Sequence, residues 1–361
     1  MRRYEISITD QNGLPKVING SNGQPIFNGS FSSTTIAGQT IPGALNVEMD
    51  LPVSTYNSPI GGASIKIYGV GLPLLSQAAN FNPSISTNSN GVPVEYCNIK
   101  VSGGMARGLP LAKPSQYGVL MNSQIQQAYG NWQGTHQTLD LIMVQPAGSQ
   151  NNPYNFSFKC ENNAPLEPSI RATLMNVFPN ASSININISA NLIAFEQIDA
   201  QYFTLGEFAT FLSEKSRSIL KGSYPGIQIS YIENVINVYD YTAPVIAAPI
   251  QIQFDDLIGQ PTWIGPLALT FKTVMRYDIK VGGKIMMPAQ SASGGLILTT
   301  PASQSQYRNS SIFHGEFFVT MVRHLGIFRQ GDANSWVTVI QAYAQPKTGS
   351  VNIGITLGGE G

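Results

Sequence analysis

Histidine is the side chain best suited to metal binding and to proton transfer near neutral pH, and this chain of 361 residues contains three: His136, His314 and His324. His314-Gly315-Glu316 could present two metal ligands on one face of a strand, because side chains alternate along a strand. A zinc site needs three or four ligands, and no third candidate is nearby. A Gly-x-Ser-x-Gly motif, which would mark a serine nucleophile, is absent. We therefore favour solvated or core histidines over a metal site or a catalytic triad.

Paired carboxylates are the next chemistry to consider, because glycoside hydrolysis requires two of them. Asp255, Asp256 and Asp278 are the best candidates. Asp278 lies between a predicted strand and Val281-Gly282-Gly283, where a turn-forming aspartate is expected. Because Asp and Glu number only 20 together, the sequence predicts no catalytic residue, no cofactor-binding residue and no metal ligand.

Two further patterns resemble ligand sites. Gly69-Val70-Gly71 follows a predicted strand, but position 74 is not glycine and Pro73 opposes an immediate helix, so we interpret it as a strand end. Tyr129, Trp132 and His136 could stack a sugar or a base. The favoured alternative is a hairpin tip with one packed tryptophan.

Charge and cysteine content exclude several classes of protein. Lys and Arg together number 20, so the net charge is zero, and charged residues make up only 11% of the chain. A basic nucleic-acid binder and an acidic tail are both disfavoured. Cys97 and Cys160 are too few for a disulfide framework and are predicted to be buried thiols. No apolar run reaches the ~18 residues of a membrane span, and no export signal is visible, so a soluble or assembling chain is expected.

The distribution of charge indicates an assembly. Residues 17–47 and 67–94 contain no Asp, Glu, Lys or Arg. A dispersed monomer usually keeps a charged surface. Coverage by neighbouring subunits explains these stretches most simply, although disordered polar loops would produce the same pattern.

Alternating apolar residues predict a mainly β chain. The predicted strands lie at 45–51, 65–70, 119–125, 139–144, 227–239, 267–275, 317–322 and 336–343. Five Asn-Gly pairs supply tight-turn signals, at 12–13, 19–20, 22–23, 28–29 and 90–91. No repeat of 20 to 50 residues is visible, which disfavours solenoids and propellers.

Two segments have helical spacing instead. Leu166, Ile170, Leu174 and Phe178 recur every fourth residue behind Pro165, which predicts a helix over 165–178. Thr204 and Glu207 form a capping box before a second helix over 204–220, whose apolar face comprises Leu205, Phe208, Leu212 and Ile219. A strand pair turning at Glu233-Asn234 follows.

These patterns divide the chain into three parts. Breaks rich in Pro, Gly, Ser and Asn lie at 145–154 and 242–249. We predict a first β domain over 1–150, an α/β module over 151–248, and a second β region over 249–361 that could complete a second barrel with earlier segments.

One stretch is distinctive enough to suggest a family. It reads Asp255-Asp256-Leu257-Ile258-Gly259-Gln260-Pro261-Thr262-Trp263, continues as a strand over 267–276, and ends in Tyr277-Asp278-Ile279-Lys280-Val281-Gly282-Gly283-Lys284-Ile285. This resembles the late region of baseplate or tail hub proteins of contractile-tailed bacteriophages, in which a Leu-Ile-Gly-x-Pro turn precedes a strand and an Arg-x-Asp-Leu-x-Val-Gly-Asp-x-Ile-like loop. Here Gly283 replaces the acidic residue and Ile279 the leucine.

Other segments are similar to the same family in outline. Residues 321–326, followed by Trp336-Val337-Thr338, look like its closing hairpin, in which His324 is structural. Residues 65–69, 99–104 and 118–125 resemble its tube-like barrel, with 130–142 as the last hairpin.

The resemblance implies tube-like antiparallel β-barrel domains with a small helix-hairpin insertion, and a structural, non-enzymatic virion protein without cofactors. It also implies a homotrimer that adapts a hexameric tail tube to a trimeric central spike, beside other baseplate proteins, with no membrane insertion and no specific nucleic-acid binding. A tail-associated carbohydrate-binding or hydrolytic β protein is the main alternative. A plain capsid or tube subunit is a third, but it has no reason to carry the α/β module.

Overall fold

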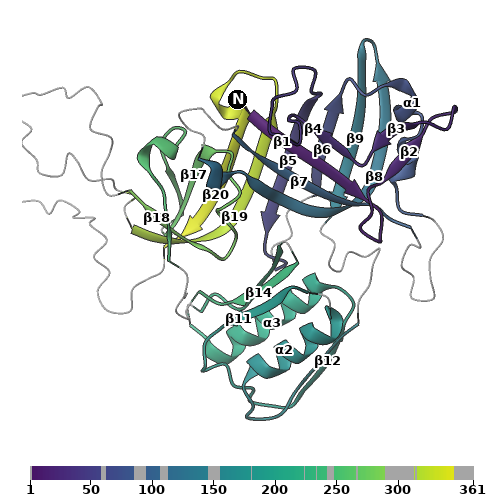
Figure 1. Ribbon diagram of the computed structural model, residues 1–361. Helices are drawn as coiled ribbons and strands as arrows, with labels where there is room; N and C mark the ends of the chain where they lie inside the picture. The colour runs from purple at the N-terminus through teal and green to yellow at the C-terminus, as the bar shows by residue number, and fades with distance from the viewer. Residues whose placement is uncertain are drawn as a thin grey trace, which may run out of the picture.

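The computed structural model in Figure 1 is mainly β, with two long helices in the middle of the chain, as the sequence predicts. It describes residues 2–57, 62–84, 95–105, 113–144, 155–179, 181–222, 224–232, 234–241, 248–265, 267–288, 313 and 315–344.

The first part of the chain forms an antiparallel sheet. Its strands are β1 (Arg2–Thr9), β4 (Ser30–Ser32), β5 (Asn46–Ser54), β6 (Ala63–Tyr68), β7 (Asn98–Met105), β8 (Gly118–Gln133) and β9 (His136–Val144), in the order β5-β6-β9-β8-β7-β1-β4. A separate hairpin joins β2 (Val17–Asn19) and β3 (Pro25–Asn28). Alternate side chains of β1, namely Tyr4, Ile6 and Ile8, are fully buried, as period-two patterning requires.

The last part of the chain extends this sheet. Its strands are β15 (Ile250–Gln251), β16 (Thr262–Gly265), β17 (Ala268–Val274), β18 (Lys284–Met287), β19 (Gly315–Ile327) and β20 (Trp336–Tyr343), in the order β16-β17-β20-β19, with β18 beside β19 and β15 beside β18. The long strand β19 pairs with β20, and its other edge pairs first with β18 and then with β5. The two β parts therefore share one sheet of 13 strands and one apolar core.

Each half of this sheet curls back on itself. In the first half, Arg2 at the start of β1 donates to the Ile327 carbonyl at the end of β19 (2.7 Å), and the ring of Tyr4 packs edge-on against Phe328. In the second half, Leu257 forms an isolated β-bridge with Thr273 of β17. Because Leu257 follows β15, and β15 pairs with β18, this bridge connects the two outer strands of the β17-β20-β19-β18 group. Two barrel-like halves result, lying at the right and left of Figure 1.

The middle of the chain has its own core. It contains β10 (Phe156–Cys160), α2 (Leu166–Val177), β11 (Ser183–Asn187), β12 (Ile198–Tyr202), α3 (Leu205–Leu220), β13 (Gln228–Ile232) and β14 (Val235–Tyr239). β11 runs parallel to β14, β13 pairs with β14 as a hairpin, and β10 pairs with β12. The predicted residues of both helix faces are buried in this second core.

Local signals explain where the two helices begin. Thr204 accepts the Glu207 amide while the Glu207 carboxylate accepts the Thr204 amide, so the predicted capping box is present. α2 begins directly after Pro165, whose restricted φ suits the entrance to a helix.

The end of β5 fixes the module to the sheet. The Asn57 amide donates to the carbonyls of Ala209 and Ile227 and accepts from the Ile229 amide. Tyr56, one residue earlier, belongs to the module core. The module is thus held by hydrogen bonds and packing as well as by its chain connections.

The structure corrects two details of the sequence interpretation. A short helix, α1 (Leu72–Leu75), begins directly after Gly71, so the expectation that Pro73 opposes an immediate helix was wrong. Proline is tolerated in the first turn, where its missing N–H leaves no bond unmade. Strands β1, β10, β11 and β12 are among those that the alternation of apolar residues did not predict. The other short helices are 3-10 helices at Ala78–Phe81, Pro114–Gln116, Phe254–Asp256 and Ala333–Ser335.

The exact domain boundaries stay predictions. Residues 145–154 and 242–247 lie outside the described part of the chain, and the predicted boundaries at 150 and 248 fall in or beside them.

Candidate functional site

The structure brings together two of the three candidate carboxylates, but through an arginine. Arg276 donates to both carboxylate oxygens of Asp278 (2.6 Å each) and, through Nη1, to Asp256 (3.2 Å). Lys113 Nζ lies 2.8 Å from the other Asp256 oxygen. We call these four residues the Arg276 cluster. Asp255, the neighbour of Asp256, lies outside it.

Three separate elements position the cluster. Arg276 follows the end of β17, and its backbone N–H donates to Thr338 of β20. Asp256 belongs to the 3-10 helix before β16 and accepts the Gln253 amide. Lys113 directly precedes the 3-10 helix before β8. The cluster therefore joins the last β region to the first.

The electrostatics of the cluster favour a structural role. Burial tends to raise the pKa of Asp256, but hydrogen bonds from Lys113 and the Gln253 amide and the charge of Arg276 outweigh it, so that this pKa lies below its usual value. A general acid needs a raised pKa instead. Arg276 is only 4% exposed and pairs with both Asp256 and Asp278. The cluster therefore presents no free carboxylate pair to a substrate.

The two histidines that the structure describes do not form a site. His324 on β19 is buried, its Nδ1 lies 2.9 Å from Thr338 Oγ1, and burial lowers its pKa to about 3, so it is neutral. His136 is exposed at the start of β9, and His314 lies outside the described residues. Glu316 is exposed on β19, 3.6 Å from Lys284. Among the residues that the structure describes, no group of three His, Cys, Asp or Glu could hold a metal ion.

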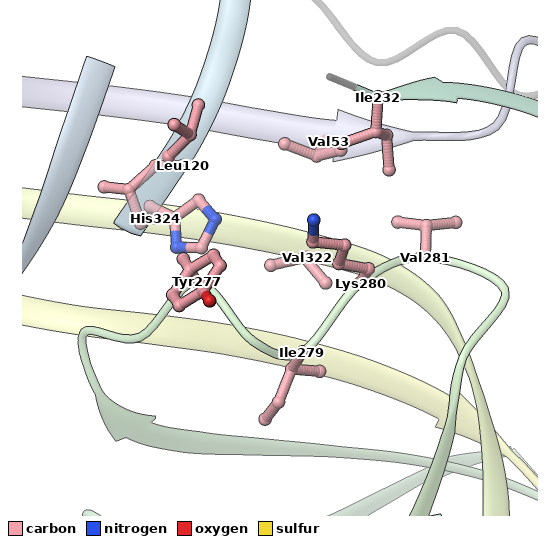
Figure 2. Close-up of a pocket in the computed structure, with 10 residues that line it drawn as sticks. Val53, Leu120, Ile232, Tyr277, Ile279, Lys280, Val281, Val322 and His324 are labelled. Atoms are coloured by element: carbon pink, nitrogen blue, oxygen red, sulfur yellow. The ribbon is translucent and has the colours of Figure 1, made fainter. Parts of the chain in front are cut away.

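A cavity beside His324 is too small for a substrate. Figure 2 shows its lining, which includes Leu120, Ile232, Tyr277, Lys280 and His324. Its volume of about 10 Å³ is the space of about one water molecule. Ile232 comes from the module and the other four residues from the two β parts, so the cavity is a packing gap where the three parts meet.

The aromatic residues of the β8–β9 hairpin do not form a stacking platform. Tyr129 and Trp132 are three residues apart in a regular ladder, so their side chains point to opposite faces. The predicted hairpin is present, but the expectation of a packed tryptophan was wrong, since Trp132 is 64% exposed. The hairpin extends past α1, and α1 covers it only as far as Gly130. The close approach is seen at Gly130, where an added Cβ would lie 2.4 Å from the Leu75 carbonyl oxygen.

Two remaining predictions concern the cysteines and membrane-spanning segments. Cys97 and Cys160 are buried free thiols, as predicted. No helix in the described ranges is long and apolar enough to cross a bilayer.

The Arg276 cluster is the feature that sequence reasoning missed. Its signal was present, because Asp256, Arg276 and Asp278 all lie within the distinctive stretch at 255–288. The sequence interpretation considered these aspartates only as acids or turn formers. It did not include Arg276, which lies between them in the sequence.

Comparisons with known proteins give structural matches only. No protein-family model matches the chain, and no curated protein is similar to it in sequence. The E. coli c3393 protein, a type VI secretion component described as similar to T4 bacteriophage tail proteins gp27 and gp5, matches with a TM-score of 0.44 and 9% identity, over 85% of this chain and 76% of that one.

Two tail proteins match over nearly the whole chain. The tail protein from Neisseria meningitidis MC58 has a TM-score of 0.41 and 10% identity, covering 94% of this chain and 96% of its own. The 43 kDa tail protein of prophage MuSo2 from Shewanella oneidensis has a TM-score of 0.43 and 7% identity, covering 94% and 97%. These structural neighbours are tail and secretion-system proteins.

Proposed function

We propose that this chain is a structural subunit of a phage tail, and specifically a trimeric baseplate hub. Three copies with two barrel-like halves each would present six barrels around a channel, which matches a hexameric tail tube on one side and a trimeric central spike on the other. Its partners are then two further copies, the tube protein, the spike protein and other baseplate proteins. Its location is the virion baseplate.

The observation that carries this proposal is the duplication of barrel-like halves in one sheet. Pairing of β19 with β5 fixes the two halves side by side without a flexible linker between them. A symmetry adaptor needs this rigidity, because the angle between its two halves sets the spacing of the ring. The Arg276 cluster adds a second bond between the same two parts.

The absence of a substrate site among the described residues supports a non-enzymatic role. Asp256 and Asp278 are paired with cations, and the cavity in Figure 2 holds about one water. Incubation with peptidoglycan and with lipopolysaccharide sugars should therefore give no turnover. Turnover that is lost on Asp255→Asn or Glu316→Gln would contradict the proposal and favour the hydrolytic alternative.

Assembly provides the direct test. Light scattering after gel filtration should give the mass of a trimer, or a complex that forms when a tube or spike protein is added. A monomer that binds none of the tail proteins would contradict the hub and favour the carbohydrate-binding alternative.

A further inference from the structure

The turn between β19 and β20 presents five oxygen acceptors to one guanidinium group. Four of them are backbone carbonyls and the fifth is a side-chain hydroxyl, and Arg2 at the start of β1 donates to each. They belong to Ile327, Phe328, Gln330, Asp332 and Ser335. We call these five acceptors the turn cage. Figure 1 shows the start of β1 beside this turn.

The geometry of the turn cage suits a planar, forked cation. Arg2 Nη1 lies 2.7 Å from the carbonyl oxygen of Ile327 and 3.4 Å from that of Phe328, and it also donates to the third carbonyl of the cage. Nη2 lies 2.7 Å from the Asp332 carbonyl oxygen and 2.8 Å from Ser335 Oγ. The acceptors therefore divide between two nitrogens of one plane, as a guanidinium requires. An ammonium group has a single nitrogen and cannot serve both sets.

Contacts that do not involve Arg2 hold the turn cage in shape. The Phe328 N–H donates to the carbonyl of Val47 on β5 (2.8 Å). Within the turn, Ser335 Oγ lies 2.9 Å from the Gln330 carbonyl oxygen. Because β5 and the turn itself position these acceptors, we expect the cage to persist when the arginine side chain is removed.

The surroundings of the turn cage also favour a cation that can enter from solvent. The Arg2 Cζ atom lies 5.9 Å from the centre of the Trp336 ring, within the range of a cation–π contact. Burial lowers the pKa of Arg2, and the charge of the Asp332 carboxylate opposes this effect. Arg2 is only partly buried, so the cage is open on one side.

We infer that the turn cage is a binding site for a guanidinium group, and that its ligand in this protein is Arg2, which closes the first β part. The strand order of that part runs from β5 to β4, and no ladder joins β4 to β5 among the described strands. Arg2 joins β1, the neighbour of β4, to the end of β19, which pairs with β5. A side chain thus closes this half where strand pairing stops. The inference does not depend on the proposed hub.

Chemical rescue tests the site. Arg2→Ala removes the guanidinium and should lower the thermal midpoint of the chain. Titration with methylguanidinium chloride up to about 50 mM should raise that midpoint toward the wild-type value in a saturable way, because the ligand stabilises only the folded form that binds it. A Kd of about 1 to 10 mM, measured by isothermal titration calorimetry, is expected for so small a ligand. The wild-type protein, whose cage is filled, should show no such binding.

Two controls separate a guanidinium site from a general effect of cations. Methylammonium chloride at the same concentrations should not rescue Arg2→Ala, because one nitrogen cannot reach both sets of acceptors. Arg323→Ala is the matched variant, since Arg323 also uses two guanidinium nitrogens but pairs with the carboxylate of Asp50 on the surface. Methylguanidinium should leave its midpoint unchanged.

A variant that does not fold alone still gives a result. If Arg2→Ala is unfolded, the yield of folded protein after refolding should be higher with methylguanidinium than with methylammonium. Equal effects of the two salts, an equal response of Arg323→Ala, or a midpoint of Arg2→Ala identical to the wild type would overturn the site. None of these measurements reads the oligomeric state, so their failure would leave the proposed hub standing.

Discussion

Arg276 is one of three buried Asp, Glu, Lys or Arg side chains in the described part of the chain, with Asp240 and Asp256. It is 4% exposed, and its two carboxylate partners come from the turn after β17 and from the 3-10 helix before β16. Removing one partner from a buried ion pair is costly, because the remaining charge loses its compensation. The cluster therefore joins the two β parts at a point where substitution is poorly tolerated.

Arg276→Met should lower the free energy of unfolding by about 3 to 5 kcal/mol, because Asp256 and Asp278 lose their shared cation. Urea denaturation measures the change. Arg323→Met is the control, since Arg323 pairs with Asp50 on the surface, where both side chains are more than a third exposed, and it should cost less than about 1 kcal/mol. Equal losses in both variants would contradict the structural role of the cluster.

His324 should make stability depend on pH between about 6.5 and 4.5. The folded protein keeps this imidazole neutral because its pKa is about 3, whereas in the unfolded chain it takes up a proton near pH 6.5. Falling pH therefore favours unfolding, by up to about 1.4 kcal/mol per pH unit. Asp256 adds to this pH dependence only below about pH 5, because only there does an ordinary carboxyl of the unfolded chain take up protons while the lowered pKa keeps Asp256 ionised in the folded protein.

His324→Asn retains a group that can bond Thr338 but does not titrate. The slope between pH 6.5 and 4.5 should decrease in this variant. An identical slope in the two proteins would show that His324 is accessible to protons in the folded state.

Elements with strong local signals were predictable, and elements without them were not. α3 has a capping box and an apolar face, and both are present as the sequence indicates. β10, β11 and β12 are five-residue strands whose pairing depends on partners from 38 to 52 residues away, so local alternation alone did not identify them. Trp132 is exposed two residues beyond Gly130, where α1 packs on the hairpin, and this position depends on tertiary packing.

Leu212 tests the core of the module. It is fully buried on α3, so Leu212→Ala should cost about 2 to 5 kcal/mol through lost apolar burial and the cavity left behind. Thr210→Ala, an exposed position on the same helix, should leave the thermal midpoint nearly unchanged. An unchanged midpoint in Leu212→Ala would mean that this helix face is not the core.

Gly282 tests the contact between module and sheet. Its φ is +84°, and an added Cβ would lie 2.6 Å from the Tyr239 ring. Gly259→Ala is a matched control, because its φ of +76° is similar but no atom lies within 4 Å of the added Cβ.

Both glycine substitutions should cost about 1 to 2 kcal/mol from backbone strain alone. Gly282→Ala should cost about 1 to 3 kcal/mol more, because Tyr239 must move. Limited proteolysis should then release the module in Gly282→Ala and not in Gly259→Ala. Equal stability and equal cleavage of the two variants would contradict the packing of Tyr239 on this turn.

At the scale of the whole molecule, the sequence predicts the parts better than their connection. A mainly β chain with a central α/β module follows from periodicity and is present. The pairing of β19 with β5 joins residues more than 260 positions apart, for example Leu325 with Asp50, and no local pattern specifies such a partner. This pairing turns two predicted β regions into one sheet with two barrel-like halves, which is the basis of the proposed hub.

The symmetry of the assembled ring is the most direct measurement of that hub. Cryo-electron microscopy of the purified protein, alone or bound to its tail tube, should show in end view three copies around a channel. Six barrel densities of two alternating kinds should surround the channel, with three peripheral densities for the modules. A ring of six copies that each contribute one barrel, or isolated single copies, would contradict the symmetry-adaptor account.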